Sequence, residues 1–223
     1  MLTNTMKSSA IRVLATLALA AVPGFASPIY VNNFSFEDSL PSTTAGVNCG
    51  LGCTVWAGAI PGWTGGDGRF QPGSPANPHY FTTAPTNGAT LAFSQGGTIS
   101  QVVAPTVQAG LLYTLQVDIG WRADPGQGFD GSADLLIGGV SCGASCLAVG
   151  VTPTKGNWST FTATYIGTVA DVGKTITLEL QSSGPQGDFD NVRLDAVPEP
   201  ASLLLIGSAL LGLGALRRRR ANS

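Results

Sequence analysis

Residues 111–121 of the chain read "LLYTLQVDIGW". The large apolar side chains of this stretch fall at every second position, at Leu111, Tyr113, Leu115, Val117 and Ile119. A period of two in β-branched and aromatic residues is typical of a half-buried β-strand. No long segment between residues 27 and 196 has the period of an amphipathic helix. The sequence therefore predicts an all-β body.

Further segments of the same kind follow along the chain. They are "GTISQVVA" (97–104), "ADLLIGGV" (133–140), "WSTFTATYIG" (158–167), "KTITLELQSS" (174–183) and "FDNVRLDAV" (189–197). Turn-forming stretches such as "PTVQAG" and "VADVGK" separate them. Their spacing predicts an antiparallel β-sandwich of the jelly-roll type. Residues 41–87 are richer in Gly, Pro and Thr, and we expect long loops around a few short strands there.

The first 26 residues form a pattern of their own. Lys7 and Arg12 precede an apolar run at 13–22, and small residues follow at Ala26 and Ser27. This order is that of a secretory signal peptide, which the Sec machinery exports and which we expect to be cleaved after Ala26. An apolar run of this length is too short to span a bilayer.

The segment "VPEPASLLLIGSALLGLGALRRRR" occupies residues 197–220. A triplet of Pro198, Glu199 and Pro200 precedes an apolar helix predicted at 201–216, which at about 1.5 Å per residue is shorter than a bilayer core of about 30 Å. Four arginines end the segment: Arg217, Arg218, Arg219 and Arg220. They orient the chain with its C-terminus in the cytoplasm. A cleavable address is favoured, and a permanent tail anchor is the alternative.

Removing both terminal segments leaves a body at residues 27–196 that suits one domain. This body has five basic residues against twelve acidic ones, a net charge of −7. Such an acidic body excludes nucleic-acid binding, which needs Lys and Arg to neutralise phosphates.

The cysteines occur as two pairs, Cys49 with Cys53 and Cys142 with Cys146. An even count in an exported chain favours disulfides, and the short glycine-containing spacers favour two local bridges. A zinc site made of four thiolates is the alternative.

Motifs for catalysis are not found in the sequence. His79 is the single histidine, and the chain has no G-x-S-x-G, H-E-x-x-H or P-loop sequence. The sequence therefore predicts that the protein is not an enzyme. Aromatic side chains with polar neighbours bind sugars, and the candidates for glycan contact are Trp56, Tyr80, Trp121 and Arg122.

Two resemblances rest on these motifs. The C-terminal segment resembles the PEP-CTERM sorting signal of Gram-negative bacteria, which implies cleavage by exosortase and an association with exopolysaccharide and biofilm. The body, through "NNFSFED", "IPGWT" and "GDFDNVRL", resembles jelly-roll domains of such proteins and carbohydrate-binding modules. That second resemblance implies a structural calcium ion between Glu37 and Asp190.

The expected protein is exported, transiently anchored in the inner membrane, and then placed on the cell surface or in the extracellular matrix. We expect a structural or adhesive role there, with weak contacts to extracellular polysaccharide. A carbohydrate-active hydrolase and a tail-anchored surface binding protein are the alternatives.

Overall fold

The structure is a computed structural model and describes residues 26–38, 45–73 and 80–199. The predicted signal helix, the apolar helix at 201–216, Pro200, the four terminal arginines and His79 lie outside the described residues. Among the residues that are described, no helix is long and apolar enough to cross a membrane.

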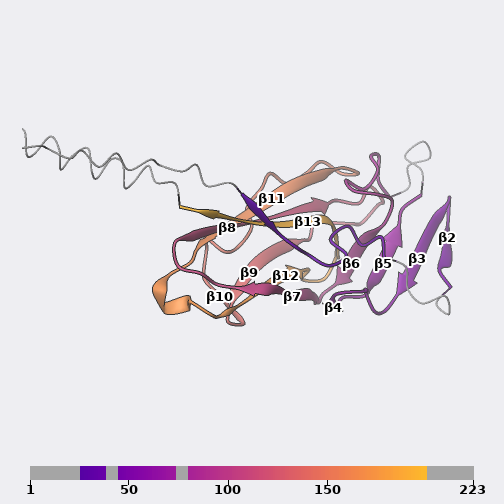
Figure 1. Ribbon diagram of the computed structural model, residues 1–223. Helices are drawn as coiled ribbons and strands as arrows, with labels where there is room; N and C mark the ends of the chain where they lie inside the picture. Colours follow the sequence, from indigo (N-terminus) through magenta and orange to yellow (C-terminus); the bar gives the residue numbers. More distant parts are fainter. Residues whose placement is uncertain (1–25, 39–44, 74–79, 200–223) are drawn as a thin grey trace, which may run out of the picture. The chain divides into compact units, whose positions relative to one another are not determined.

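Two antiparallel sheets make up the described body (Figure 1). The larger sheet has eight strands, in the order β11-β8-β13-β6-β5-β3-β2, with β1 paired to β13. Their bounds are β1 (Ser27–Ile29), β2 (Val47–Gly50), β3 (Cys53–Ala57), β5 (Gly68–Gln71), β6 (Leu91–Gln95), β8 (Leu111–Gly120), β11 (Trp158–Ile166) and β13 (Gln186–Pro198).

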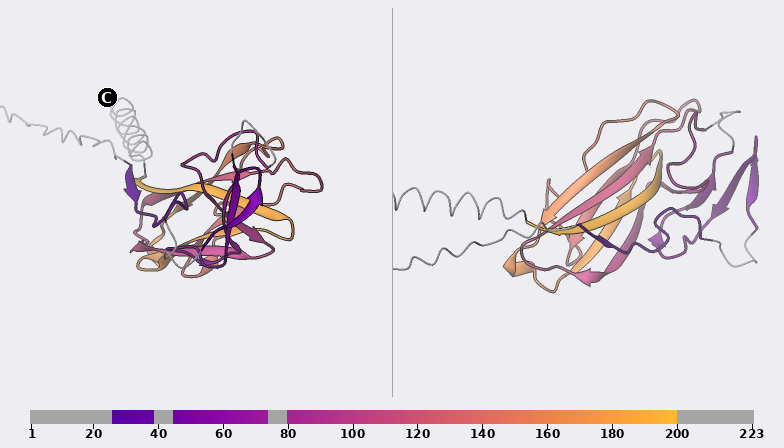
Figure 2. Two further views of the ribbon diagram at one scale, coloured as in Figure 1. Left: turned by 90° about the vertical axis from the view of Figure 1, so that its right-hand side faces the viewer. Right: turned by 45° about the horizontal axis from the view of Figure 1, so that its top comes forward.

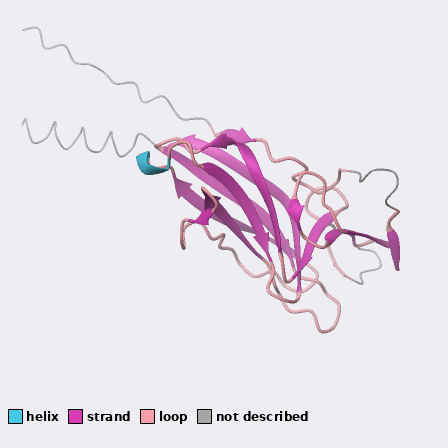
Figure 3. Ribbon diagram, turned by 90° about the horizontal axis from the view of Figure 1, so that it is seen from below, coloured by secondary structure: helices cyan, strands magenta, loops and turns pink. Residues whose placement is uncertain are grey.

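The smaller sheet has five strands in the order β10-β9-β12-β7-β4. Their bounds are β4 (Thr64–Gly65), β7 (Thr98–Thr106), β9 (Ser132–Ile137), β10 (Val140–Ser141) and β12 (Thr175–Gln181). The one helical element of the described part is a 3-10 turn, η1 (Val169–Asp171), and Figure 3 shows how little of the body it occupies. The predicted all-β antiparallel sandwich is confirmed.

The core lies between the two sheets, and β8 shows why. Tyr113, Leu115, Val117 and Ile119 are each at most 1% exposed and belong to the main hydrophobic cluster. They pack with inward-facing residues of the smaller sheet such as Leu178, which is fully buried. The period of two in the sequence therefore identified the buried face correctly.

Strand β13 is the longest strand and lies inside the larger sheet (Figure 2). It pairs with β8 along one side, and with β6 and then β1 along the other. Ser27 lies opposite Ala196, so the first residues of the described chain lie beside its last ones.

Two local features differ from the expected strands. The single strand predicted at 133–140 is divided into β9 and β10 by a turn at Gly138 and Gly139, both with positive φ. Glycine adopts this backbone without strain, which explains the break. The short strands β2, β3 and β5 extend the larger sheet beyond β6, away from the end where β13 finishes (Figure 1).

Replacing Leu115 by alanine tests this account of the core. Leu115 is fully buried, so Leu115→Ala should lower the free energy of unfolding by about 2–5 kcal/mol. Leu112→Ala is the matched control, because Leu112 is half-exposed on the other face of β8, and its loss should be smaller. Urea unfolding measures both, and equal losses would contradict the assignment of the faces.

Candidate functional site

The larger sheet has an outer face, which is the face turned away from the core. A bulge in β13 determines which of its side chains lie on that face. The pairing of β13 with β8 shifts between Asp190 and Arg193, and Asn191 has a positive φ of 51°. Phe189 and Val192 on either side of the bulge belong to the core. Alternation then directs Asp190 and Asn191 both to the outer face.

The outer face also carries a second hydrophobic cluster, made of side chains from β3, β5 and β6 with the segment at residues 80–81. Beside it lies a pocket of about 260 Å³, which we call the outer-face pocket. It is lined by Cys49, Val55, Phe70, Tyr80, Phe93, Gln95, Arg122 and Gln186. One wall is therefore aromatic and apolar, whereas the other carries amides and a guanidinium. Such a lining suits a small ligand with a flat apolar body and a few polar groups.

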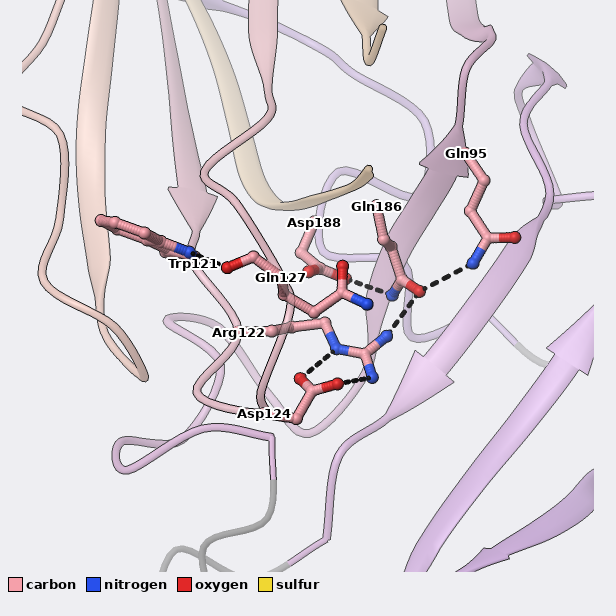
Figure 4. Close-up of polar contacts among 7 residues, drawn as sticks. All are labelled: Gln95, Trp121, Arg122, Asp124, Gln127, Gln186 and Asp188. Carbon is pink, nitrogen blue, oxygen red and sulfur yellow. Dashed lines mark hydrogen bonds and ion pairs between the residues drawn. The ribbon is translucent and has the colours of Figure 1, made fainter. Parts of the chain in front are cut away.

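Arg122 organises the polar wall (Figure 4). Its Nε and Nη2 donate to the two carboxylate oxygens of Asp124 at 2.8 Å each, and its Nη1 donates to Gln186 Oε1 at 2.6 Å. The guanidinium also lies over the ring of Tyr80, 4.6 Å from the centroid, and within 5.8 Å of that of Phe70. A bidentate ion pair of this kind fixes geometry as well as charge. Arg122 therefore joins the aromatic wall to the amides.

Asp188 lies behind this polar wall and is completely buried. Gln186 Nε2 donates to its Oδ1 at 2.7 Å, whereas its Oδ2 has no hydrogen-bond partner in the described part of the chain. Burial raises the pKa of Asp188 to about 7, against the opposing effects of the Gln186 hydrogen bond and the Arg122 charge. A substantial fraction of this carboxyl is therefore protonated at neutral pH and can donate a proton.

Glu37 and Asp190, the expected calcium ligands, are brought to one loop. Glu37 accepts hydrogen bonds from the backbone of Ala89 and Thr90, and Asp190 accepts them from the Asn87 backbone and the Thr86 hydroxyl. Their burial differs, since Glu37 is exposed and Asp190 is fully buried.

Carboxylate oxygens are the donor type that calcium prefers, but those of Glu37 and Asp190 already accept hydrogen bonds from this loop. A bound ion would staple the loop to β13 and would supply stability. The described residues contain no group of three or more His, Cys, Asp or Glu side chains that could hold a metal. A calcium ion between Glu37 and Asp190 stays a prediction.

Of the four residues predicted to contact glycans, the structure brings Tyr80 and Arg122 together in the pocket. Trp121 does not line it, and its Nε1 donates to the Gln127 backbone carbonyl at 3.0 Å. Trp56 is also outside the lining and packs against Arg69.

Sequence reasoning missed the amide wall. Gln95 and Gln186 stand at the end of β6 and the start of β13, where no motif marks them. In the sequence, Asp188 is simply the first acidic residue of "GDFDN". The sequence does not show that it is buried.

Both predicted local disulfides are present, Cys49 with Cys53 and Cys142 with Cys146. No described cysteine is free, so the zinc alternative fails for lack of thiolates. The first bridge holds the β2–β3 hairpin and contributes Cys49 to the pocket wall.

The fold and site define a class of protein: a β-sandwich with a ligand-sized pocket on the outer face of its larger sheet and a buried acid behind that pocket. The family model described as HpiC1 cyclase matches residues 27–195, and the chain belongs to this HpiC1-like family. A second model, the PEP-CTERM protein-sorting motif, matches residues 196–220 and confirms the resemblance seen in the sequence. No curated protein matches the chain.

Solved structures of cyclases share the fold. A cyclase from Fischerella sp. TAU is 24% identical, with a TM-score of 0.59 over 78% of this chain and 98% of that one. A cyclase from the same source in complex with 4-(1H-indol-3-yl)butan-2-one is 23% identical, with a TM-score of 0.58 over 77% and 98%. The CBM22-1 xylan-binding domain of Paenibacillus barcinonensis Xyn10C is also similar, at 13% identity and a TM-score of 0.40 over 80% of this chain and 98% of that domain.

These comparisons correct the prediction about enzyme activity and support the prediction of a sorting signal. The prediction that the protein is not an enzyme is wrong, because its family is one of cyclases and the cyclase structures share its fold. A single buried carboxyl such as Asp188 leaves no spacing pattern in the sequence. The sorting motif implies export, processing by exosortase at the membrane and a location at the cell surface.

The burial of Asp188 predicts how stability changes with pH. Its pKa is about 7 in the folded protein and 3.8 in the unfolded chain, so the folded state binds more protons between these values. Stability should therefore fall as the pH rises from about 4 to 7. Asp190, whose pKa burial also raises to about 7, contributes in the same direction.

Asp188→Asn should remove the part of this pH-dependent change in stability that Asp188 causes. That part is roughly 4 kcal/mol for the full pKa shift of about three pH units. The variant should gain stability relative to the native chain at pH 7 and should show a shallower pH dependence. Urea unfolding between pH 4 and pH 7.5 measures this. An identical pH dependence in the two proteins would show that Asp188 ionises normally in the folded state.

Proposed function

We propose that the protein is an exported enzyme of the cyclase type that acts on a small ring-bearing substrate in the outer-face pocket. The observation that carries the proposal is the buried Asp188 carboxyl, whose Oδ2 has no partner among the described residues and which lies one side chain behind the pocket. Membership of the HpiC1-like family and the cyclase fold support the reaction type.

The substrate class follows from the two walls of the pocket. Phe70, Tyr80 and Phe93 offer ring faces and edges for stacking, and the volume of about 260 Å³ limits the ligand to a small molecule. The indole compound named with the Fischerella cyclase has a flat bicyclic ring and a short ketone chain. A ligand of that chemistry would place its ring against the aromatic wall and its carbonyl toward the amides and Arg122.

The chemical step is a proton transfer from Asp188. Its Oδ2–H bond breaks as a C–H bond forms at an electron-rich carbon of the bound ring system, which leaves a carboxylate and a cationic substrate. Gln186 and Arg122 stabilise that carboxylate. A second carbon of the same molecule attacks the cation to close a ring, and loss of a proton to Asp188 restores the acid.

Gln186 controls the approach of the substrate to the acid. It lines the pocket and holds Asp188 through its Nε2, so its amide must turn aside for a ligand to reach Oδ2. Hydrogen bonds at catalytic groups often tighten only in the substrate complex, so the closed arrangement without ligand is compatible with this role.

The proposal is tested by solvent-proton exchange into the indole probe 4-(1H-indol-3-yl)butan-2-one in heavy water. The native protein should bind the probe and accelerate deuterium incorporation at its ring carbons. Asp188→Asn should lower that rate by about 100-fold or more, the usual contribution of a general acid, while binding the probe with similar affinity.

Phe93→Ala is the companion variant, since it should weaken binding and leave the acid in place. Mass spectrometry measures exchange, and titration calorimetry measures binding. A native protein that neither binds the probe nor differs from Asp188→Asn in exchange would sink the proposal.

A matrix role is the second candidate. The protein would act as a structural or adhesive component of the exopolysaccharide matrix, with weak glycan contact at the same pocket. The sorting motif favours it, as does the combination of aromatic rings with the amides of Gln95 and Gln186. Binding of neutral oligosaccharides without any exchange activity would favour this candidate over the cyclase.

A further inference from the structure

The sorting motif begins inside the folded sheet. The two family matches meet between residues 195 and 196, yet β13 runs through this boundary without a break and ends at Pro198. Along β8, Ala196 lies opposite Tyr113, Val197 opposite Leu112 and Pro198 opposite Leu111. The first residues of the sorting segment are therefore strand residues of the body. The domain boundary predicted after Ala196 falls within β13, and it remains a prediction.

One more backbone bond extends this pairing into the triplet. The Glu199 N–H donates to the Gly110 carbonyl at 2.9 Å. In an antiparallel strand, the hydrogen-bonding groups of successive residues point alternately to the two sides. Because Glu199 turns its N–H to β8, Pro198 directs its carbonyl to the opposite side, as Ala196 does toward Ser27 of β1.

That opposite side has no strand partner for Pro198 among the described residues. The first described strand, β1, begins at Ser27 and reaches only as far as Ala196. Pro198 itself is exposed. The cleavage predicted after Ala26 would remove the residues before Ser27, so none would be left to extend β1 alongside Pro198. After that loss, residues 197–199 would form an extended strand end that is hydrogen-bonded to β8 on one side and has no described strand beside Pro198 on the other.

We propose that this strand end is the surface that the membrane sorting protease reads, by adding an extended segment of its own along the open side of residues 197–199. Addition of a strand to an exposed edge is a common way of recognising extended peptides. The protease would donate an N–H to the Pro198 carbonyl, because proline offers an acceptor and no donor.

The energetic reason is preorganisation. Residues 197–199 are already held extended by β8, so the entropy of ordering them is lost on folding of the body and not on binding to the protease. A motif on a flexible tail would lose that entropy in the recognition complex. Processing is therefore coupled to folding, and a chain with an unfolded body is cut slowly. This inference rests on the sorting motif and is independent of the pocket and its chemistry.

The test compares two insertions in the full-length protein, expressed in a host that carries the sorting protease. A short Gly-Ser linker between Ala196 and Val197 detaches the motif from the sheet and leaves its sequence intact. The same linker between Gly138 and Gly139 is the matched control, since that turn is exposed and joins β9 to β10. Pulse-chase labelling with intact-mass analysis gives the rate of C-terminal cleavage.

The first insertion should slow cleavage by about tenfold or more, because residues 197–199 would then have to be ordered in the recognition complex itself. The control should be cut at the native rate. Cleavage of the detached motif at the native rate or faster would overturn the proposal, because it would show that the protease takes a free tail.

A second measurement guards against a misfolded variant. In the uncut native protein, the Glu199 amide should exchange its hydrogen slowly compared with an unstructured peptide, because it is bonded to Gly110. Exchange at the peptide rate would equally overturn the proposal. Melting curves of both insertion variants should show a folded body.

Discussion

The pairing of β13 with β8 determines where the core, the buried acids and the start of the sorting motif lie. It holds Phe189, Val192 and Leu194 in the core and turns Asp188 and Asp190 to the outer face. The bulge at Asn191 makes this possible. It places Asp190 and Asn191, two consecutive residues, on the outer face, while the side chains before and after them still alternate between core and outer face. One strand thus joins the core, the buried acid and the start of the sorting motif.

Burial of acids on this face costs stability, which points to a role in function. Desolvation raises the pKa of both Asp188 and Asp190 to about 7, and within the described part of the chain Gln186 alone donates a hydrogen bond to the Asp188 side chain. A packed apolar side chain would stabilise the fold more. Groups of this kind gather at active sites, where a shifted pKa serves proton transfer. The hydrophobic core offsets the stability that burial of these two acids costs.

Much of the fold could be predicted from the sequence, whereas little of the site could be. The alternation in β8 fixed the core face, and the cysteine spacing identified both disulfides, because each is a local pattern. The pocket joins Phe70, Phe93 and Gln186 across strands that are distant in sequence, and no local pattern reveals such a meeting. Arg122 and Tyr80 could be predicted because aromatic side chains with polar neighbours are typical of ligand contacts. Nothing in the sequence shows that an aspartate is buried.

The protonation of Asp188 can be measured directly, by titrating its side-chain carboxyl carbon by NMR in the folded protein. The environment behind the pocket predicts a midpoint near pH 7, with the resonance of a neutral acid below it. Assignment by comparison with Asp188→Asn identifies the signal. A midpoint near the ordinary aspartate value of about 4 would contradict the account, because the carboxyl would then be ionised at neutral pH and could not serve as the acid.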